Sequence, residues 1–306
     1  MVPPAFGRLT SVQDGEADRR RQLIGVAFLC VVAVVVLYVL AVHTVLGQRI
    51  DEKAVSGHPW QRMSSGDAKR YETSAVVLIG ALALATVFEA RRCWRLLMVL
   101  GAVSLGAVLL SELLREVVFD RPNLVGHNWL VSASYPSGHA TAATMVALVC
   151  LVMTPWPLWL RRLLALGVIA VTDGVLLFIP IHRPSDILGG HLLALAAISG
   201  TLALIGSRSD LLGRFVGEGS AGSTTRRFVR LVGVSMALVA VLLAVMTLLA
   251  SRTNFPITDY GVAFPVGFAA IMVGAAGTVT VLEVLMSADH DHAEPKSDEV
   301  ATSSTG

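Results

Sequence analysis

The chain has 306 residues, of which 54% are hydrophobic and 15% charged, and its mean hydropathy is +0.69. Soluble domains carry about 25% charged residues, so this composition excludes an ordinary soluble domain and indicates a membrane protein. The formal net charge of +2 gives no sign of a nucleic-acid partner, and the three cysteines form no disulfide or zinc pattern.

Eight apolar stretches predict transmembrane helices, because a bilayer core needs about 20 apolar residues per helix and backbone groups in lipid must be satisfied internally. In chain order they are residues 23–46, 73–90, 95–114, 138–156, 159–179, 186–206, 228–250 and 262–286. The predicted fold class is therefore all-α, a polytopic membrane helix bundle with about eight spans.

Polar stretches between these runs divide the chain into parts. A segment rich in Gly, Ser and charge separates a unit of six helices from a two-helix addition. The expected parts are a cytoplasmic N-terminal segment 1–22, a six-helix membrane core 23–206, a cytoplasmic linker 207–227, two additional transmembrane helices 228–286 and a disordered tail 287–306.

The distribution of Lys and Arg predicts the orientation. Most of these residues lie in the N-terminal segment, the linker and the connections on the same side. Cytoplasmic loops carry an excess of Lys and Arg. Both termini are therefore expected in the cytoplasm, in an integral plasma-membrane protein of the cell envelope.

Three polar segments interrupt the apolar pattern, and this orientation places all three at the extracytoplasmic surface. They read REVVFDRPN (115–123), YPSGH (135–139) and IHRPSD (181–186). Ionisable groups near a bilayer are costly and tend to be functional or paired. The polar connection 47–72 is expected as an interfacial segment over the same site.

The residue types in these segments favour phosphate chemistry. Ser137 and Gly138 open a helix, whose N-terminal N–H groups attract anions, and Arg121 offers a planar fork that suits a phosphate. His182 and Asp186 are four residues apart, so a carboxylate can fix the imidazole tautomer and leave the other nitrogen as a nucleophile. His139 can then protonate the leaving oxygen. Taken singly, Ser137 is also a plausible helix cap.

Pro-Ser-Gly-His, preceded by Arg-Pro and followed some forty residues later by His-x-x-x-Asp, resembles the type 2 phosphatidic acid phosphatase superfamily over about residues 70–206. The resemblance implies a six-helix lipid phosphatase. In such enzymes the histidine matched by His182 attacks phosphorus and forms a phosphohistidine, the aspartate matched by Asp186 supports it, and the histidine matched by His139 protonates the leaving group. Arg121, Ser137 and Gly138 match phosphate-binding positions.

Two motifs depart from the family pattern. Leu114 stands where the first motif has Lys, with Arg115 one position later. Val175 and Leu176 stand where the third motif has Ser-Arg. Arg115 and Arg183 are therefore the candidates for the remaining phosphate contacts, and a non-catalytic member that binds anionic lipid or serves as a scaffold subunit is the alternative.

The resemblance implies hydrolysis of a phosphate monoester or diphosphate of a lipid at the outer leaflet. No cofactor and no metal are expected, since a zinc site built on the two histidines would leave the anion-binding turn without a role. The expected partners are a lipid phosphate or polyprenyl diphosphate substrate and membrane lipids, with no nucleic acid. Membrane-protein partners and a homo-oligomer both remain open.

One acidic residue falls inside an apolar run. Asp173 lies about two turns inside the C-terminal end of the predicted helix 159–179. We expect it to pair with Arg115 or Arg183, or to make a polar contact between helices. His191 is expected to pack rather than to react.

Overall fold

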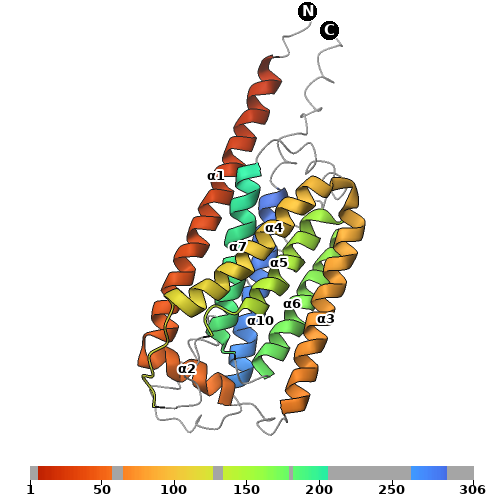
Figure 1. Ribbon diagram of the computed structural model, residues 1–306. Helices are drawn as coiled ribbons and strands as arrows, with labels where there is room; N and C mark the ends of the chain where they lie inside the picture. The colour runs from red at the N-terminus through yellow and green to blue at the C-terminus, as the bar shows by residue number, and fades with distance from the viewer. Residues whose placement is uncertain (1–5, 57–64, 127–133, 179–181, 206–262, 288–306) are drawn as a thin grey trace, which may run out of the picture.

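The computed structural model describes residues 6–56, 65–126, 134–178, 182–205 and 263–287, and within these ranges the regular structure is helical, with no strand. The helices form an elongated bundle (Figure 1). In chain order they are α1 (Phe6–Leu37), the π-turn η1 (Tyr38–Val42), α2 (Val45–Ser56), α3 (Ser65–Ala90), the 3₁₀ turn η2 (Arg91–Cys93), α4 (Trp94–Leu113), the π-turn η3 (Leu114–Val118), α5 (Gly138–Met153), α6 (Leu158–Phe178), α7 (Pro184–Ile205) and α10 (Ala263–Ser287).

The all-helical membrane character predicted from composition is confirmed. Within the described ranges, 5 helices are long and apolar enough to cross a membrane, and α5 is a shorter apolar helix of 16 residues. The candidate spans are Ala17–Val42, Thr73–Ala90, Trp94–Val118, Pro184–Ile205 and Val266–Met286. The predicted helix at 228–250 lies outside the described residues.

Helix α1 starts much earlier than the apolar pattern predicted. It begins at Phe6, within the polar segment that was expected to end at residue 22. Strong helix formers such as Glu16 and Arg19 connect the polar and apolar parts, and the helix continues through the Asp14-Gly15 step. Gln22 also donates to Asp18 one turn earlier, over 2.8 Å.

Helices α5 and α7 form the buried centre of the bundle, and a pair of glycines allows them to approach closely. A Cβ added at Gly190 would lie 2.8 Å from the Ser137 carbonyl oxygen and 2.9 Å from the Ala140 Cβ. A Cβ at Gly189 would meet the ring of Tyr135. This Gly-Gly step therefore brings the start of α5 against the first turns of α7.

Helix α1 runs antiparallel to α7, and α10 packs on the other side. Near one end of the bundle Gly200 approaches Ala27, and near the other the Tyr135 hydroxyl donates to the Val34 carbonyl. Gly267, near the start of α10, lies against Pro184 at the start of α7. Figure 1 shows the start of α1 and the end of α10 at the end of the bundle opposite α2.

Helix α2 is short and lies at the end of the bundle away from the termini (Figure 1). Thr44 caps it, because its hydroxyl accepts from the Gly47 N–H over 2.9 Å and donates to the Leu40 carbonyl over 2.6 Å. Gly47 has no room for a side chain, since its backbone approaches the Leu40 carbonyl directly. The chain therefore turns tightly after η1 and places α2 over the starts of α5 and α7.

Candidate functional site

The three polar segments singled out in the sequence meet at this end of the bundle. The Ser137 N–H donates to the Asp186 carbonyl over 2.9 Å, which ties the YPSGH segment to the HRPSD segment. Arg121, from the segment after η3, reaches the Asp186 carboxylate with Nη2 3.3 Å from Oδ1. Both segments thus bind the same residue, Asp186, the first through its backbone carbonyl and the second through its carboxylate.

The start of α5 has the geometry of a capped helix. Ser137 is the N-cap, and its hydroxyl accepts from the Ala140 N–H over 3.3 Å. Both Ser137 and Gly138 are buried. The Glu112 carboxylate lies against Gly138, so an anionic group already occupies the approach to this glycine. The capping interpretation of Ser137 is confirmed, while its contact with a phosphate stays a prediction.

The two histidines assigned to the reaction lie close together. The rings of His139 and His182 have centroids 6.0 Å apart and planes inclined by 76°. His139 is the second residue of α5 and is exposed, whereas His182 precedes α7 and is 8% exposed. Contacts of about 3 Å from each ring nitrogen reach atoms of a single phosphate ester.

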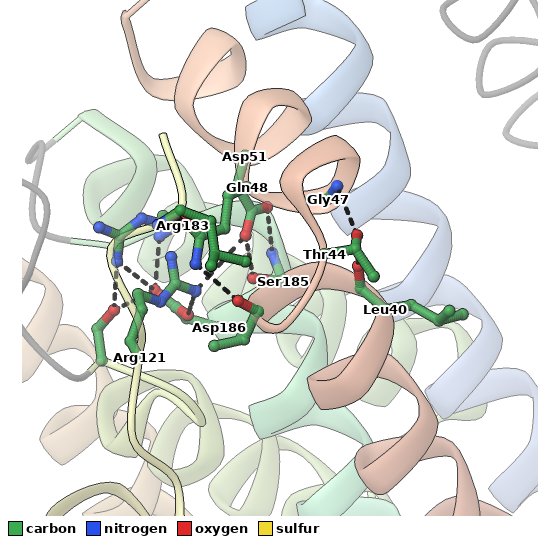
Figure 2. Close-up of polar contacts among 12 residues, drawn as sticks. Leu40, Thr44, Gly47, Gln48, Asp51, Arg121, Arg183, Ser185 and Asp186 are labelled. Carbon is green, nitrogen blue, oxygen red and sulfur yellow. Dashed lines mark hydrogen bonds and ion pairs between the residues drawn. The ribbon is translucent and has the colours of Figure 1, made fainter. Parts of the chain in front are cut away.

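Asp186 is the hub of the polar network. It is the third residue of α7, and its Oδ2 accepts from the Arg183 backbone N–H over 2.9 Å, as the acidic residue of a capping box does. The same oxygen accepts from the Ser134 hydroxyl over 2.6 Å. Together with Arg121, these donors hold the carboxylate in one orientation (Figure 2). Whether Asp186 also orients His182 stays a prediction.

The Arg183 side chain points toward this network. Its direction could not be inferred from the sequence. Its Nη1 donates to the Ser134 hydroxyl over 2.9 Å and lies 4.0 Å from Asp186 Oδ2. The guanidinium is buried, and Figure 2 shows Arg183 and Arg121 converging on Asp186. Two guanidinium groups therefore lie beside the Asp186 carboxylate.

Arg115 takes a different direction. Its Nη2 pairs with Glu112 and lies 3.0 Å from Glu116 Oε1, and its side chain is 27% exposed. Because Glu112 in turn lies against Gly138, Arg115 reaches the start of α5 through this carboxylate. The structure does not bring it into the Arg121–Arg183 cluster by any contact among the described residues.

Helix α2 contributes a residue that the sequence analysis did not single out. Asp51 is 4% exposed, accepts hydrogen bonds from both the hydroxyl and the N–H of Ser185, and has its Oδ2 3.6 Å from Arg121 Nη2. Burial and the neighbouring carboxylate of Asp186 raise the pKa of Asp51 to about 6, although Arg121 and Ser185 act in the opposite direction.

The same helix holds the segment that carries Arg121. Gln48 Nε2 donates to the carbonyls of Val42, over 2.7 Å, and Pro122, over 2.6 Å, and its Oε1 accepts from the Leu124 N–H over 3.1 Å. Figure 2 shows Gln48 and Asp51 of α2 together with Arg183 and Ser185. The expectation of a polar segment over the site holds for residues 47–56, while residues 57–64 lie outside the described ranges.

The first of the two contacts expected for Asp173, an ion pair with Arg115 or Arg183, is wrong. Asp173 pairs with neither arginine in the structure. Its Oδ2 lies 3.0 Å from His191 Nε2, and both side chains are buried between α6 and α7. The alternative, a polar contact between helices, is the one observed. The physical reason is that Arg115 and Arg183 find carboxylates in their own segments.

The arrangement combines two close imidazoles, two buried guanidinium groups and a capped helix start. Such a set can bind an oxyanion and supply both a nucleophile and a proton donor. The described residues hold no group of three or more His, Cys, Asp or Glu side chains with metal-binding geometry. Comparison of the chain with family models, with curated proteins and with solved structures finds no match.

Proposed function

We propose that the chain is an integral membrane lipid phosphatase that hydrolyses a phosphate monoester or diphosphate of a lipid through a phosphohistidine intermediate. The observation that carries the proposal is the 6.0 Å separation of the His139 and His182 rings. The two residues are 43 positions apart, His139 in the first turn of α5 and His182 just before α7, so the fold brings them together.

The proposed reaction has two steps. A ring nitrogen of His182 attacks phosphorus, the ester bond to the lipid oxygen breaks, and His139 donates a proton to that oxygen. Water then attacks the phosphohistidine with His139 as base, the nitrogen–phosphorus bond breaks, and inorganic phosphate leaves. Arg121 and Arg183 stabilise the charge on the phosphoryl oxygens, and the start of α5 supplies N–H groups.

The location of the site also belongs to this proposal. The site lies at the end of the bundle opposite the start of α1 and the end of α10, and the Lys and Arg distribution predicts that those helix ends face the cytoplasm. We therefore assign the site to the outer leaflet, in a six-helix phosphatase core supplemented by two C-terminal helices. A lipid substrate then reaches the site from the membrane with its headgroup at the surface.

A direct test incubates the purified protein with phosphatidic acid, phosphatidylglycerophosphate and polyprenyl diphosphate and measures released phosphate. We expect release from at least one substrate and a loss of at least about 1,000-fold in His182→Asn. His191→Asn is the matched control, because it removes a buried imidazole from the same helix without touching the site. Equal loss in both variants would contradict the assignment of His182.

A non-catalytic lipid-binding or scaffold role is the second candidate. It is favoured by the engagement of both guanidinium groups with protein carboxylates, Arg121 with Asp51 and Asp186 and Arg183 with Asp186. No phosphate release from any of the three substrates, together with co-purification of membrane subunits, would support this role instead.

A further inference from the structure

We propose that Asp51 is a positioning residue of the phosphate site, which holds Arg121 before substrate binds and competes with the substrate's phosphoryl group for this arginine. Neutralising Asp51 should therefore strengthen the binding of a phosphate-like anion. This inference rests on the proposed function, because it assigns a role to a residue beside the same phosphate-binding groups.

The contacts of Asp51 support the competition. Its Oδ2 lies 3.6 Å from Arg121 Nη2, and the same nitrogen lies 3.3 Å from Asp186 Oδ1. One guanidinium edge is thus shared by two carboxylates. Arg121 is 5% exposed in its side chain, so a phosphoryl oxygen that binds this edge must replace one of the two carboxylates.

Of the two carboxylates, Asp51 is the one that a phosphoryl group can displace from Arg121. Asp186 is fixed by Arg121, by the Ser134 hydroxyl and by the Arg183 N–H, which belong to the loop before α5 and the start of α7. Among the described residues, Asp51 accepts hydrogen bonds from Ser185 alone, while Arg121 and Arg183 attract its charge. Asp51 also lies on the short helix α2, which is not one of the candidate membrane spans.

The charge balance indicates why the competition matters. Two guanidinium groups, Arg121 and Arg183, face two carboxylates, Asp51 and Asp186, so the cluster has no net positive charge when both acids are ionised. An anion gains little from a neutral cluster. When Asp51 is neutral, the cluster carries one positive charge in a buried setting, where charges interact strongly.

The pH range follows from the surroundings of Asp51. Burial and Asp186 raise its pKa to about 6, against the effects of Arg121, Ser185 and Arg183. On its own helix, Glu52 is the next acidic group. Of the elements packed on α2, α10 carries only Glu283, which pairs with Arg162 at the opposite end, and η1 carries Tyr38, which donates to Asp120.

The direction in which anion affinity changes with pH follows from this raised pKa of Asp51. Below about pH 6 Asp51 is protonated and releases Arg121, so anion binding strengthens as the pH falls. A ratio between two proteins that both keep His139 and His182 isolates the effect of Asp51.

The experiment measures the dissociation constant of sulfate by calorimetry on the full chain in detergent. Sulfate mimics phosphate but stays a dianion throughout the range, so changes in its affinity report protein groups alone. Wild type and Asp51→Asn are compared at about pH 5 and about pH 8, values that bracket the pKa of about 6. Glu283→Gln is the matched control, because it also removes a buried carboxylate that pairs with an arginine, but at the opposite end of the bundle.

At about pH 8 we expect Asp51→Asn to bind sulfate roughly tenfold or more tightly than wild type, from the loss of one buried charge beside Arg121. At about pH 5 the ratio should approach about 1, because wild-type Asp51 is then neutral. Glu283→Gln should stay within about threefold of wild type at both values, because Glu283 lies far from the site. A ratio that is at or below unity at both pH values, or equal in the Asp51 and Glu283 variants, overturns the inference.

Two further outcomes keep the inference separate from the proposed function. Sulfate binding with a ratio that does not change with pH overturns the role of Asp51 and leaves the phosphate site in place. No sulfate binding by any of the proteins at either pH contradicts both.

A second variant covers the case in which Asp51→Asn does not fold, as judged by its elution in size-exclusion chromatography. Ser185→Ala removes the hydroxyl that donates to Asp51, and a lost hydrogen bond to the ionised form raises the pKa of the acid. The rise in sulfate affinity on acidification should then begin at a higher pH than in wild type. An unchanged or lower onset overturns the inference.

Discussion

Two histidine–aspartate combinations lie along α7, and they differ in what surrounds them. Inside the bundle, His191 and Asp173 contact each other directly, with Nε2 and Oδ2 3.0 Å apart. At the start of the helix, Asp186 instead binds Arg121, and His182 lies beside the ring of His139.

The difference indicates that an imidazole–carboxylate contact does not by itself define a reactive site. The inner pair is buried between α6 and α7 with Gly274 of α10 against the ring, which suits a polar contact that fixes the helices in register. The outer combination adds guanidinium groups and a helix N-terminus, which an oxyanion needs. Three substitutions test this contrast.

The largest effect is expected for Arg121→Gln. Loss of the guanidinium that faces Asp186 should lower kcat/KM for the best substrate by roughly 100- to 1,000-fold, as removal of one transition-state donor commonly does. Arg162→Gln is the matched control, since Arg162 also pairs with a buried acid, Glu283, but at the other end of the bundle. Steady-state phosphate release measures the activity of both variants. Equal losses of activity would contradict the assignment of the reaction to the Arg121 end of the bundle.

An intermediate effect is expected for Asp173→Asn. The contact with His191 is an interhelical polar contact within the membrane, so its loss should reduce the free energy of unfolding by about 1 to 2 kcal/mol. Unfolding in mixed micelles of increasing SDS content measures this change. Activity per folded molecule should stay within about threefold of wild type, and a loss comparable to that of Arg121→Gln would place the inner pair in the reaction.

The smallest effect on stability is expected for Ser137→Ala. The hydroxyl of Ser137 caps α5 through a bond of 3.3 Å, and loss of an N-cap of this length should cost about 0.5 to 1 kcal/mol. Ser137→Asn keeps a capping side chain and should restore most of this stability. If Asn restores stability but not activity, the hydroxyl contributes to phosphate binding as well as to the cap.

Much of the bundle was predictable from the sequence, because apolar runs of helical length specify membrane helices without knowledge of their neighbours. The helices at residues 73–90 and 184–205 follow such runs closely. The convergence of Arg121, Ser137 and Asp186 was also predictable, since the three segments lie on the same side of the membrane in the predicted topology.

The role of α2 was not predictable at the level of single residues. Asp51 binds Ser185 across 134 positions, and Gln48 binds Pro122 across 74. Such contacts leave no local pattern in the sequence. A carboxylate within a polar segment is therefore expected to be solvated even where the fold buries it. The direction of Arg183 depended on Ser134, and the partner of Asp173 depended on how α6 and α7 face each other.

The most direct measurement of the central claim is detection of the covalent intermediate. Wild type and His139→Asn are mixed with the substrate that gives the highest phosphate release, quenched with alkali, digested and analysed by mass spectrometry. The account predicts a phosphoryl group on His182, which accumulates in His139→Asn because hydrolysis of the intermediate has lost its base. Phosphate release that proceeds without any adduct on His182, or with an adduct on another residue, would contradict it.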